Sequence, residues 1–295
     1  MSAQTMNPHQ HTQLQDKVRP AKGSPRHRPT LATLTLSRIS VELRSYRRQP
    51  DTVFFTFLFP VMMLCIFATA FSNLSFGPDD LGLTAAGYYL PAMLASGVLL
   101  SGFQNLGSDL AVERYDGTRR RLALTPLPVA AYLLGKLGLV LITALVQAVL
   151  LIAVARFAFD VPLPDSWSAW TTLIWVFLLG LGTSVVLGFL VSYLPRSAKS
   201  ATAVILPPVL ILQFVSGVYL QFSQLPEWLQ NVASVFPLKW IAQGFRAALL
   251  PDQFAVLERG EAWHLGLVAT VLAVWFVSGL VVTLLTFRWV PGDRR

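Results

Sequence analysis

Residues 107–136 read GSDLAVERYDGTRRRLALTPLPVAAYLLGK and separate two long apolar segments with a concentration of charge. The charged residues of this stretch are Asp109, Glu113, Arg114, Asp116, Arg119, Arg120, Arg121 and Lys136. Apolar runs of about 20 residues are long enough to cross the ~30 Å hydrocarbon core of a bilayer as helices. The stretch therefore predicts a polar loop between two membrane spans, and the apolar runs beside it predict an all-α membrane protein.

The composition of the whole chain supports this class. Its 295 residues are 54% hydrophobic and 13% charged, with a mean hydropathy of +0.56, whereas roughly 25% charge is usual in soluble domains. We predict a single transmembrane domain over residues 31–295. Its six spans are expected at about residues 53–73, 85–106, 132–155, 170–194, 201–220 and 264–287.

The distribution of positive charge predicts the orientation. The chain carries a net charge of +8, but its basic residues lie between the spans and fit no nucleic-acid-binding module, so no nucleic acid partner is expected. With a cytoplasmic N-terminus, 19 of the 23 lysines and arginines lie on the inner side, as the positive-inside rule requires. Both termini and the loop at 107–131 are then cytoplasmic. The outer side holds Arg156, Lys239, Arg246 and Arg259.

The chain begins with two segments that precede the first span. Residues 1–30 are polar and basic without an apolar core, which predicts a flexible cytoplasmic tail and no cleavable signal peptide. Residues 31–48 mix leucines with arginines, a pattern typical of an amphipathic helix lying at the membrane interface. The alternation of Thr33, Thr35 and Ser37 with apolar residues leaves a short strand as the alternative.

Four prolines lie inside the predicted spans: Pro60 in the first, Pro91 in the second, and Pro207 with Pro208 in the fifth. Proline removes a backbone hydrogen bond and tends to kink a helix, which neighbouring helices accommodate in a membrane. We predict hinge or gating positions at these prolines.

Small residues mark a contact surface in the fourth span, where Gly180, Ser184 and Gly188 recur at four-residue spacing. Small residues at this spacing let two helices approach closely. We interpret them as a packing seam inside one subunit rather than as a dimer contact.

The outer segment at 221–263 is amphipathic, with Trp228 and Trp240 among polar residues. Pro226 precedes its first piece and Pro237 divides it in two. Each piece is too short to span a bilayer, so we predict paired extracellular re-entrant helices that dip into the outer leaflet, with tryptophans at the interface. A soluble cap is the alternative.

Motifs for enzymatic chemistry are missing from the sequence. Gly135 and Lys136 resemble the end of a phosphate-binding P-loop, but Ala130 stands where its first glycine belongs and Leu137 where Ser or Thr belongs. Cys65 is the sole cysteine, so neither an intrachain disulfide nor a cysteine-based metal site is possible. We expect no catalytic residue, and no metal or cofactor bound by this chain.

The predicted spans contain few ionisable groups, and Gln147 and Gln213 are their mid-membrane polar residues. Proton- or sodium-coupled carriers usually place carboxylates or histidines at this depth. The spans therefore suit a hydrophobic or amphipathic cargo that is moved with energy from a separate subunit. Two alternatives stay open: an ATPase-independent channel or lipid scramblase, and a membrane anchor for a signalling complex.

The order of these parts resembles the permease subunits of the ABC type-2 exporter family, particularly the daunorubicin/doxorubicin-resistance-type drug exporters of actinobacteria. The resemblance covers about residues 31–287. The matching residues are Glu113, Arg114, Gly117, Thr118, Thr125, Pro126, Gly135 and Lys136 in the polar interruption, and Leu225, Pro226, Trp228, Leu229, Pro237, Gly244 and Arg246 in the outer segment.

The resemblance implies a permease without its own ATPase site, in which ATP and Mg²⁺ are bound by a separate ABC ATP-binding subunit. It also implies a second permease copy, as a homodimer or a related heterodimer, surrounded by the lipids of a bacterial plasma membrane. The expected activity is export of a drug, an antibiotic or a lipid-like molecule, as in multidrug efflux and drug resistance.

In this family, a short surface helix between spans two and three couples the permease to the ATPase. The resemblance assigns that role to Glu113, Arg114, Gly117, Thr118 and Arg119. We expect Thr118 to cap the helix through its side chain, and Gly117 to supply the positive-φ residue that ends the extension of span two.

The arginine triplet at 119–121 departs from the family pattern, which is often acidic or apolar here. The triplet faces an acidic groove of the ATPase or lipid phosphates, or it acts only as an orientation signal. Pro126 is expected to end the short helix.

Overall fold

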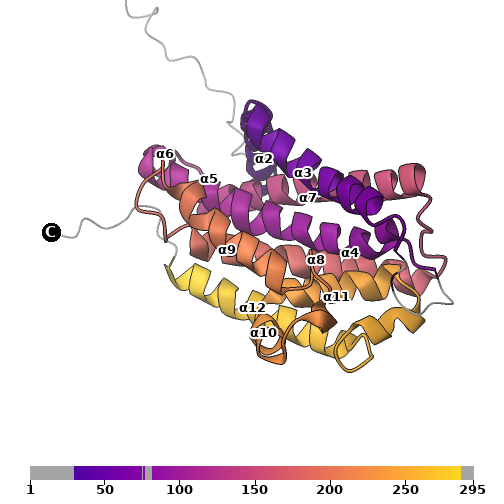
Figure 1. Ribbon diagram of the computed structural model, residues 1–295. Helices are drawn as coiled ribbons and strands as arrows, with labels where there is room; N and C mark the ends of the chain where they lie inside the picture. The colour runs from indigo at the N-terminus through magenta and orange to yellow at the C-terminus, as the bar shows by residue number, and fades with distance from the viewer. Residues whose placement is uncertain (1–29, 75, 77–81, 287–295) are drawn as a thin grey trace, which may run out of the picture.

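We describe residues 30–74, 76 and 82–286 in a computed structural model of the chain (Figure 1). Within these residues every regular element is a helix, and a single isolated bridge joins Phe76 to Leu83. This confirms the all-α membrane class. The flexible tail expected at 1–30 lies outside the described residues, apart from Thr30.

The helices begin where the sequence offers suitable first residues. The side-chain oxygens of Thr30, Thr84 and Ser166 each accept a hydrogen bond from a backbone N–H of the first turn, which satisfies a donor that the helix itself leaves free. The elements are α2 (Leu31–Arg47), α3 (Pro50–Ala70), α4 (Ala85–Leu99), the π-helix η1 (Leu100–Asn105), α5 (Leu106–Tyr115), α6 (Thr118–Ala123), α7 (Val129–Phe159), α8 (Trp167–Val191), α9 (Ala201–Val215), η2 (Phe222–Gln224), α10 (Glu227–Ala233), α11 (Pro237–Leu249), η3 (Asp252–Leu257) and α12 (Leu265–Thr286).

Five helical stretches of the described residues are long and apolar enough to cross a membrane. They are Pro50–Ala70, Ala85–Tyr115, Val129–Phe159, Trp167–Val191 and Leu265–Thr286. The remaining predicted span, residues 201–220, is wrong in length, because α9 has 15 residues and reaches only about 22 Å. It ends before Gly217, whose φ of 77° turns the chain out of the helix.

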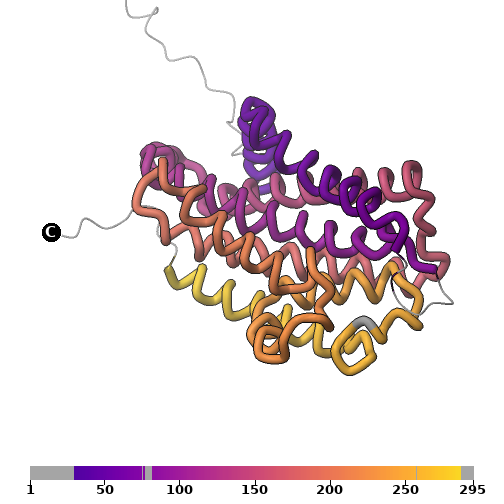
Figure 2. Tube along the Cα trace, in the orientation of Figure 1, coloured from indigo at the N-terminus to yellow at the C-terminus, as the bar shows by residue number. Residues whose placement is uncertain are grey.

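The polar interruption is largely helical, which corrects the loop predicted from residue 107. α4, η1 and α5 continue one another from Ala85 to Tyr115, as Figure 2 shows along the chain trace. The helix persists through its charged residues because their side chains have partners on other helices, described below. The link to α7 is therefore confined to α6 and the residues on either side of it.

α4 is the centre of the bundle. All of its residues are buried, and it packs against α3, α7, α8 and α11. Pro60, Pro91 and the Pro207–Pro208 pair lie inside the helices α3, α4 and α9. A hinge at these positions remains a prediction.

Small residues bring α8 against the helix of the second span. A Cβ atom on Gly188 would lie 2.1 Å from the carbonyl oxygen of Gly102, and one on Gly102 would lie 2.6 Å from Cβ of Ser184. A Cβ on Gly180 would lie 3.1 Å from Ile241 in α11. This confirms the packing seam predicted inside one subunit, and it places the seam beside the π-helix.

The two ends of the bundle carry different structures. α6 and the C-terminal end of α12 lie at one end, and the link between α7 and α8 lies at the other (Figure 1). α2 packs on α7 and is helical, so the strand alternative for this segment is wrong.

Candidate functional site

A tight turn joins the second-span helix to α6. Gly117 has a φ of 78°, which confirms the expectation that it ends the extension of the second span. The expected cap by Thr118 is wrong, because Thr118 is already the first helical residue. Its backbone N–H donates to Oδ1 of Asp116 at 2.8 Å, while its hydroxyl accepts from Arg121 at 3.0 Å. The aspartate takes the capping role because the turn at Gly117 lets its side chain fold back over the helix start.

Behind this turn, three helices share a set of charged and phenolic side chains, of which Asp109 and Arg38 are partly exposed and the others buried. We call it the α2–α5–α7 charge cluster; its members are Arg38 and Glu42 of α2, Asp109 and Glu113 of α5, and Tyr132 and Lys136 of α7. The ammonium of Lys136 is fully buried. It donates to Glu42 at 2.9 Å and to Glu113 at 2.8 Å, and it forms a short ion pair with Asp109.

The remaining contacts connect the carboxylates of the cluster. The hydroxyl of Tyr132 donates to the second oxygen of Glu113 at 2.5 Å. Arg38 forms a short ion pair with Glu42, four residues later on α2, and its guanidinium lies 3.7 Å from Glu113 and 5.4 Å from the centre of the Tyr132 ring. Each buried charge therefore has an opposite charge beside it, which offsets the cost of removing it from water.

The cluster does not fit a metal ion. Oxygen atoms of Glu42, Asp109 and Glu113 lie within 4.8 Å of one another, which is the arrangement that a divalent cation could use. However, the ammonium of Lys136 already contacts all three carboxylates. The position between the three carboxylates is occupied by the lysine, and Arg38 pairs with two of them.

Arg114 connects the end of α5 to the link between α8 and α9. Its guanidinium donates to the backbone oxygen of Pro195 at 3.1 Å and lies 5.2 Å from the centre of the Tyr193 ring. The hydroxyl of Tyr115 donates to the same oxygen at 2.9 Å. The base of α6 is thus attached to the α8–α9 link as well as to α2 and α7.

The structure divides the arginine triplet. Arg119 is buried, with 5% of its surface exposed, while Arg120 and Arg121 are exposed. Leu124, directly after the helix, is 86% exposed. α6 ends at Ala123, three residues before Pro126, which was expected to end this helix.

The residues assigned to ATPase coupling therefore occupy two different environments. Glu113 and Arg119 are buried inside the subunit, and Arg114 is engaged with Pro195. Gly117 and Thr118 form the turn and the helix start. The outward-facing side chains are those of Arg120, Arg121 and Leu124, which the sequence did not single out individually.

The partners of Glu113 are not among the coupling residues predicted from the sequence. Lys136 enters there as a charge of the polar interruption, as the end of an incomplete P-loop and as part of the family pattern, but not as a neighbour of Glu113, Arg38 and Glu42. A signal was present in the spacing, because each of the three helices contributes two polar members four residues apart, on one helical face.

The outer segment contains the two expected helices, α10 and α11, but they differ in surroundings. Pro226 and Pro237 stand at their N-terminal ends. Trp228 of α10 is 67% exposed, whereas Trp240 of α11 is 9% exposed, and its indole N–H donates to the backbone oxygen of Ser234 at 2.7 Å. α11 packs against α4, α8 and α12. A dip into the outer leaflet remains a prediction for both helices.

Arg246 connects α11 to neighbouring segments inside the bundle. It is buried, its Nε donates to Glu258 at 2.5 Å, and its Nη1 donates to the backbone oxygen of Gly217 at 3.2 Å. These contacts join α11 to the turn after α9 and to the end of η3.

The long apolar helices, with the short helix α6 between the second and third spans, define a polytopic α-helical membrane protein. A sequence model of the ABC-2 family transporter proteins matches residues 78–288. Because this match covers more than half of the chain, the chain belongs to the ABC-2 transporter family.

The chain is also similar to the probable multidrug ABC transporter permease YbhR of Escherichia coli strain K12 and to the protein of the same name from E. coli O157:H7. In each case 23% of residues are identical over 179 residues, which cover 60% of this chain and 48% of the relative. The chain therefore spans about half the length of these relatives.

Proposed function

We propose that this chain is the membrane-spanning permease subunit of an ATP-binding-cassette exporter. ATP is hydrolysed by a separate ABC ATP-binding subunit, which carries the nucleotide and Mg²⁺, and the energy moves a hydrophobic or amphipathic molecule outward. The observation that supports this most directly is α6, a short helix with exposed residues, which follows an α5 that is attached to α2, to α7 and to the α8–α9 link. Family membership and the similarity to a probable multidrug permease support the same proposal.

In this proposal α6 transmits the motion of the ATPase. The exposed side chains of Arg120, Arg121 and Leu124 contact the partner. The turn at Gly117 passes the displacement to α5, which continues as one helix into α4 at the centre of the bundle. When α5 moves, the charge cluster couples its motion to α2 and α7. Arg114 couples it to the α8–α9 link.

In this proposal the helices bend at their prolines. Pro60 and Pro91 lie within spans that border or form the core. Pro207 and Pro208 lie in α9, the shortest of the apolar helices. Since each proline removes one hydrogen bond of its helix, α3, α4 and α9 bend there when α6 is displaced.

The proposed orientation places α6 and both termini in the cytoplasm of a bacterial cell, with α10 and α11 at the outer side. The excess of positive charge on the α6 side supports it. A second permease copy completes the transport path, as a homodimer or a related heterodimer, and membrane lipids cover the apolar outer faces of the spans.

The test is co-purification of the chain with its ATP-binding subunit from a strain that expresses both. Arg120→Glu together with Arg121→Glu and Leu124→Asp is expected to reduce co-purification strongly, because these side chains are exposed and the changes reverse the charge and polarity of the surface offered to the partner. Arg156→Glu, an exposed charge reversal at the other end of the bundle, serves as the matched control. ATP hydrolysis by the isolated permease, or a complex indifferent to the α6 variants, would contradict the proposal.

The same strains separate the proposal from an ATPase-independent channel or lipid scramblase. Transport of a lipophilic dye in vesicles is expected to require ATP and the partner subunit. Equal transport by the permease alone would favour the channel or scramblase.

A further inference from the structure

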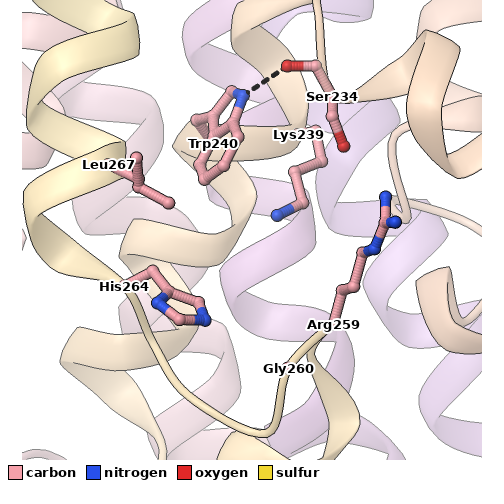
Figure 3. Close-up of a pocket in the computed structure, with 7 residues that line it drawn as sticks. All are labelled: Ser234, Lys239, Trp240, Arg259, Gly260, His264 and Leu267. Atoms are coloured by element: carbon pink, nitrogen blue, oxygen red, sulfur yellow. Dashed lines mark hydrogen bonds between the residues drawn. The ribbon is translucent and has the colours of Figure 1, made fainter.

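A pocket of about 370 Å³ lies between the start of α11, the α10–α11 link and the segment before α12, in the half of the bundle away from α6 (Figure 1). Figure 3 shows the side chains of Lys239, Arg259 and His264 around one space, with Trp240 and Leu267 on its other side. Three nitrogen-bearing side chains that can each be positively charged thus line the same pocket.

Lys239 is buried and only partly neutralised. Its ammonium lies 3.9 Å from Oε2 of Glu258 and makes a short hydrogen bond to the neutral side-chain oxygen of Gln243. The other oxygen of Glu258 accepts from Arg246, so one carboxylate serves two buried cations. Burial lowers the pKa of Lys239 to about 8; Glu258 opposes this shift, and the nearby Arg246 and Arg259 contribute to it.

Arg259 adds a charge that no carboxylate balances in the described part of the chain. Its guanidinium donates to the neutral amide oxygen of Asn231 at 2.5 Å, and no ion pair is formed between Arg259 and a described acidic residue. His264 stands at the edge of the same pocket, at the first residue before α12. The pocket therefore carries an excess of positive charge beside an apolar wall.

The apolar wall continues away from the pocket along α12. Trp240 forms one side, with its ring centre 3.9 Å from the Lys239 ammonium. Leu267, half-exposed at 50%, and Val274, exposed at 61%, lie on α12 beyond it. A hydrocarbon chain can follow this surface while its charged end stays in the pocket.

From this arrangement we infer that the pocket binds the anionic oxygen group, a phosphate or a carboxylate, of an amphipathic molecule. The cations supply charge-assisted hydrogen bonds to the oxygens, and the α12 surface accommodates the apolar part. The site goes beyond the proposed transport function and does not require ATP; only its placement at the outer leaflet rests on the proposed orientation.

The experiment measures lipid binding to the purified full-length chain by native mass spectrometry, without ATPase or nucleotide. The probes are phosphatidylglycerol and phosphatidylcholine with identical acyl chains. We expect the wild-type chain to prefer phosphatidylglycerol. Arg259→Gln is expected to weaken phosphatidylglycerol binding about tenfold, the effect of losing one charge-assisted hydrogen bond, and to leave phosphatidylcholine binding unchanged.

Arg156→Gln is the matched control, since it removes an exposed positive charge that is not part of the pocket. Equal effects of Arg156→Gln and Arg259→Gln, or no preference of the wild-type chain between the two lipids, would overturn the inference. His264→Asn provides a second pocket variant, because asparagine tolerates the φ of 45° found there.

Competition by dodecyl phosphate, laurate and inorganic phosphate identifies the source of the anionic group. Tighter binding of phosphatidylglycerol assigns the pocket to a lipid headgroup, and tighter binding of dodecyl phosphate or laurate assigns it to a single-chain amphiphile; both support the inference. Displacement of phosphatidylglycerol by inorganic phosphate at the same concentration as dodecyl phosphate would overturn the amphipathic assignment.

Discussion

Lys136 is fully buried and its ammonium contacts three carboxylates. Lys136→Met removes the cation and leaves these acids together. We expect a loss of about 3–5 kcal/mol of stability, the usual cost of breaking a buried ion pair from one side, measured as a lower midpoint of thermal unfolding in detergent.

The exposed substitution Arg121→Gln is the control and should change the midpoint little. Combining Lys136→Met with Glu113→Gln should cost less than the sum of the two single changes, because the second removes a charge that the first leaves unpaired. Additive effects would show that the cluster does not act as a unit.

Gly117 offers a second test at the same scale. Gly117→Ala places a Cβ on a residue with a φ of 78°, and the strain is expected to cost about 1 kcal/mol or more. Gly266→Ala is matched to it, because neither Cβ would meet an atom within 4 Å, but Gly266 is helical and has no positive φ. Unfolding midpoints of the two variants should differ in direction, since alanine favours a helix over glycine; a similar fall in both would contradict the strain argument.

Among the helices, the contact between α8 and the π-helix η1 has the least room. Gly188→Ala would place a Cβ 2.1 Å from the backbone oxygen of Gly102, so the two helices must separate. Overpacking of this kind typically costs about 1–3 kcal/mol. Gly182→Ala is the control, because its Cβ would meet only the ring of Phe276 at 3.0 Å, which can turn away. Limited proteolysis and unfolding midpoints measure the difference, and equal stability of the two variants would argue against a rigid seam.

The sequence predicted the apolar helices to within a few residues, because a run of about 20 apolar side chains has few other stable states in a bilayer. It failed at α5 and α9 for different reasons. The charges of α5 read as a loop, since the partner of Asp109 and Glu113 is Lys136, 27 and 23 positions further along the chain, and only tertiary packing brings them together. α9 was extended to residue 220 because the apolar pattern continues past Val215, where Gly217 turns the chain.

In the candidate site, too, local features could be predicted from the sequence, whereas features set by tertiary packing could not. Gly117 could be predicted from a local backbone requirement, whereas the inward direction of Arg119 could not, because three consecutive arginines look alike in sequence. Which of them faces outward is decided by the attachment of α6 to the rest of the bundle. The pocket at Lys239 was equally hidden, as Arg259 lies 20 positions further along the chain.

At the scale of the whole molecule, the proposals place α6 in the cytoplasm and the pocket toward the outer side of the membrane, so α6 and η3, which precedes the pocket residue Arg259, must face opposite sides. A Cys65→Ser variant removes the sole cysteine and allows single cysteines to report the side. Leu124→Cys, after α6, and Gln253→Cys, in η3, are both at exposed positions. A membrane-impermeant maleimide added to intact cells is expected to label Gln253→Cys only.

After permeabilisation both variants should be labelled to similar extents, which controls for differences in local reactivity. The expectation follows from charge: the positive-inside rule acts on short connections close to the spans, and the α6 connection carries Arg119, Arg120 and Arg121 within a few residues of two of them. If only Leu124→Cys were labelled in intact cells, the orientation would be the opposite of the proposed one. Contact between α6 and a cytoplasmic ATPase would then be impossible, although the anion-binding pocket would remain, facing the other leaflet.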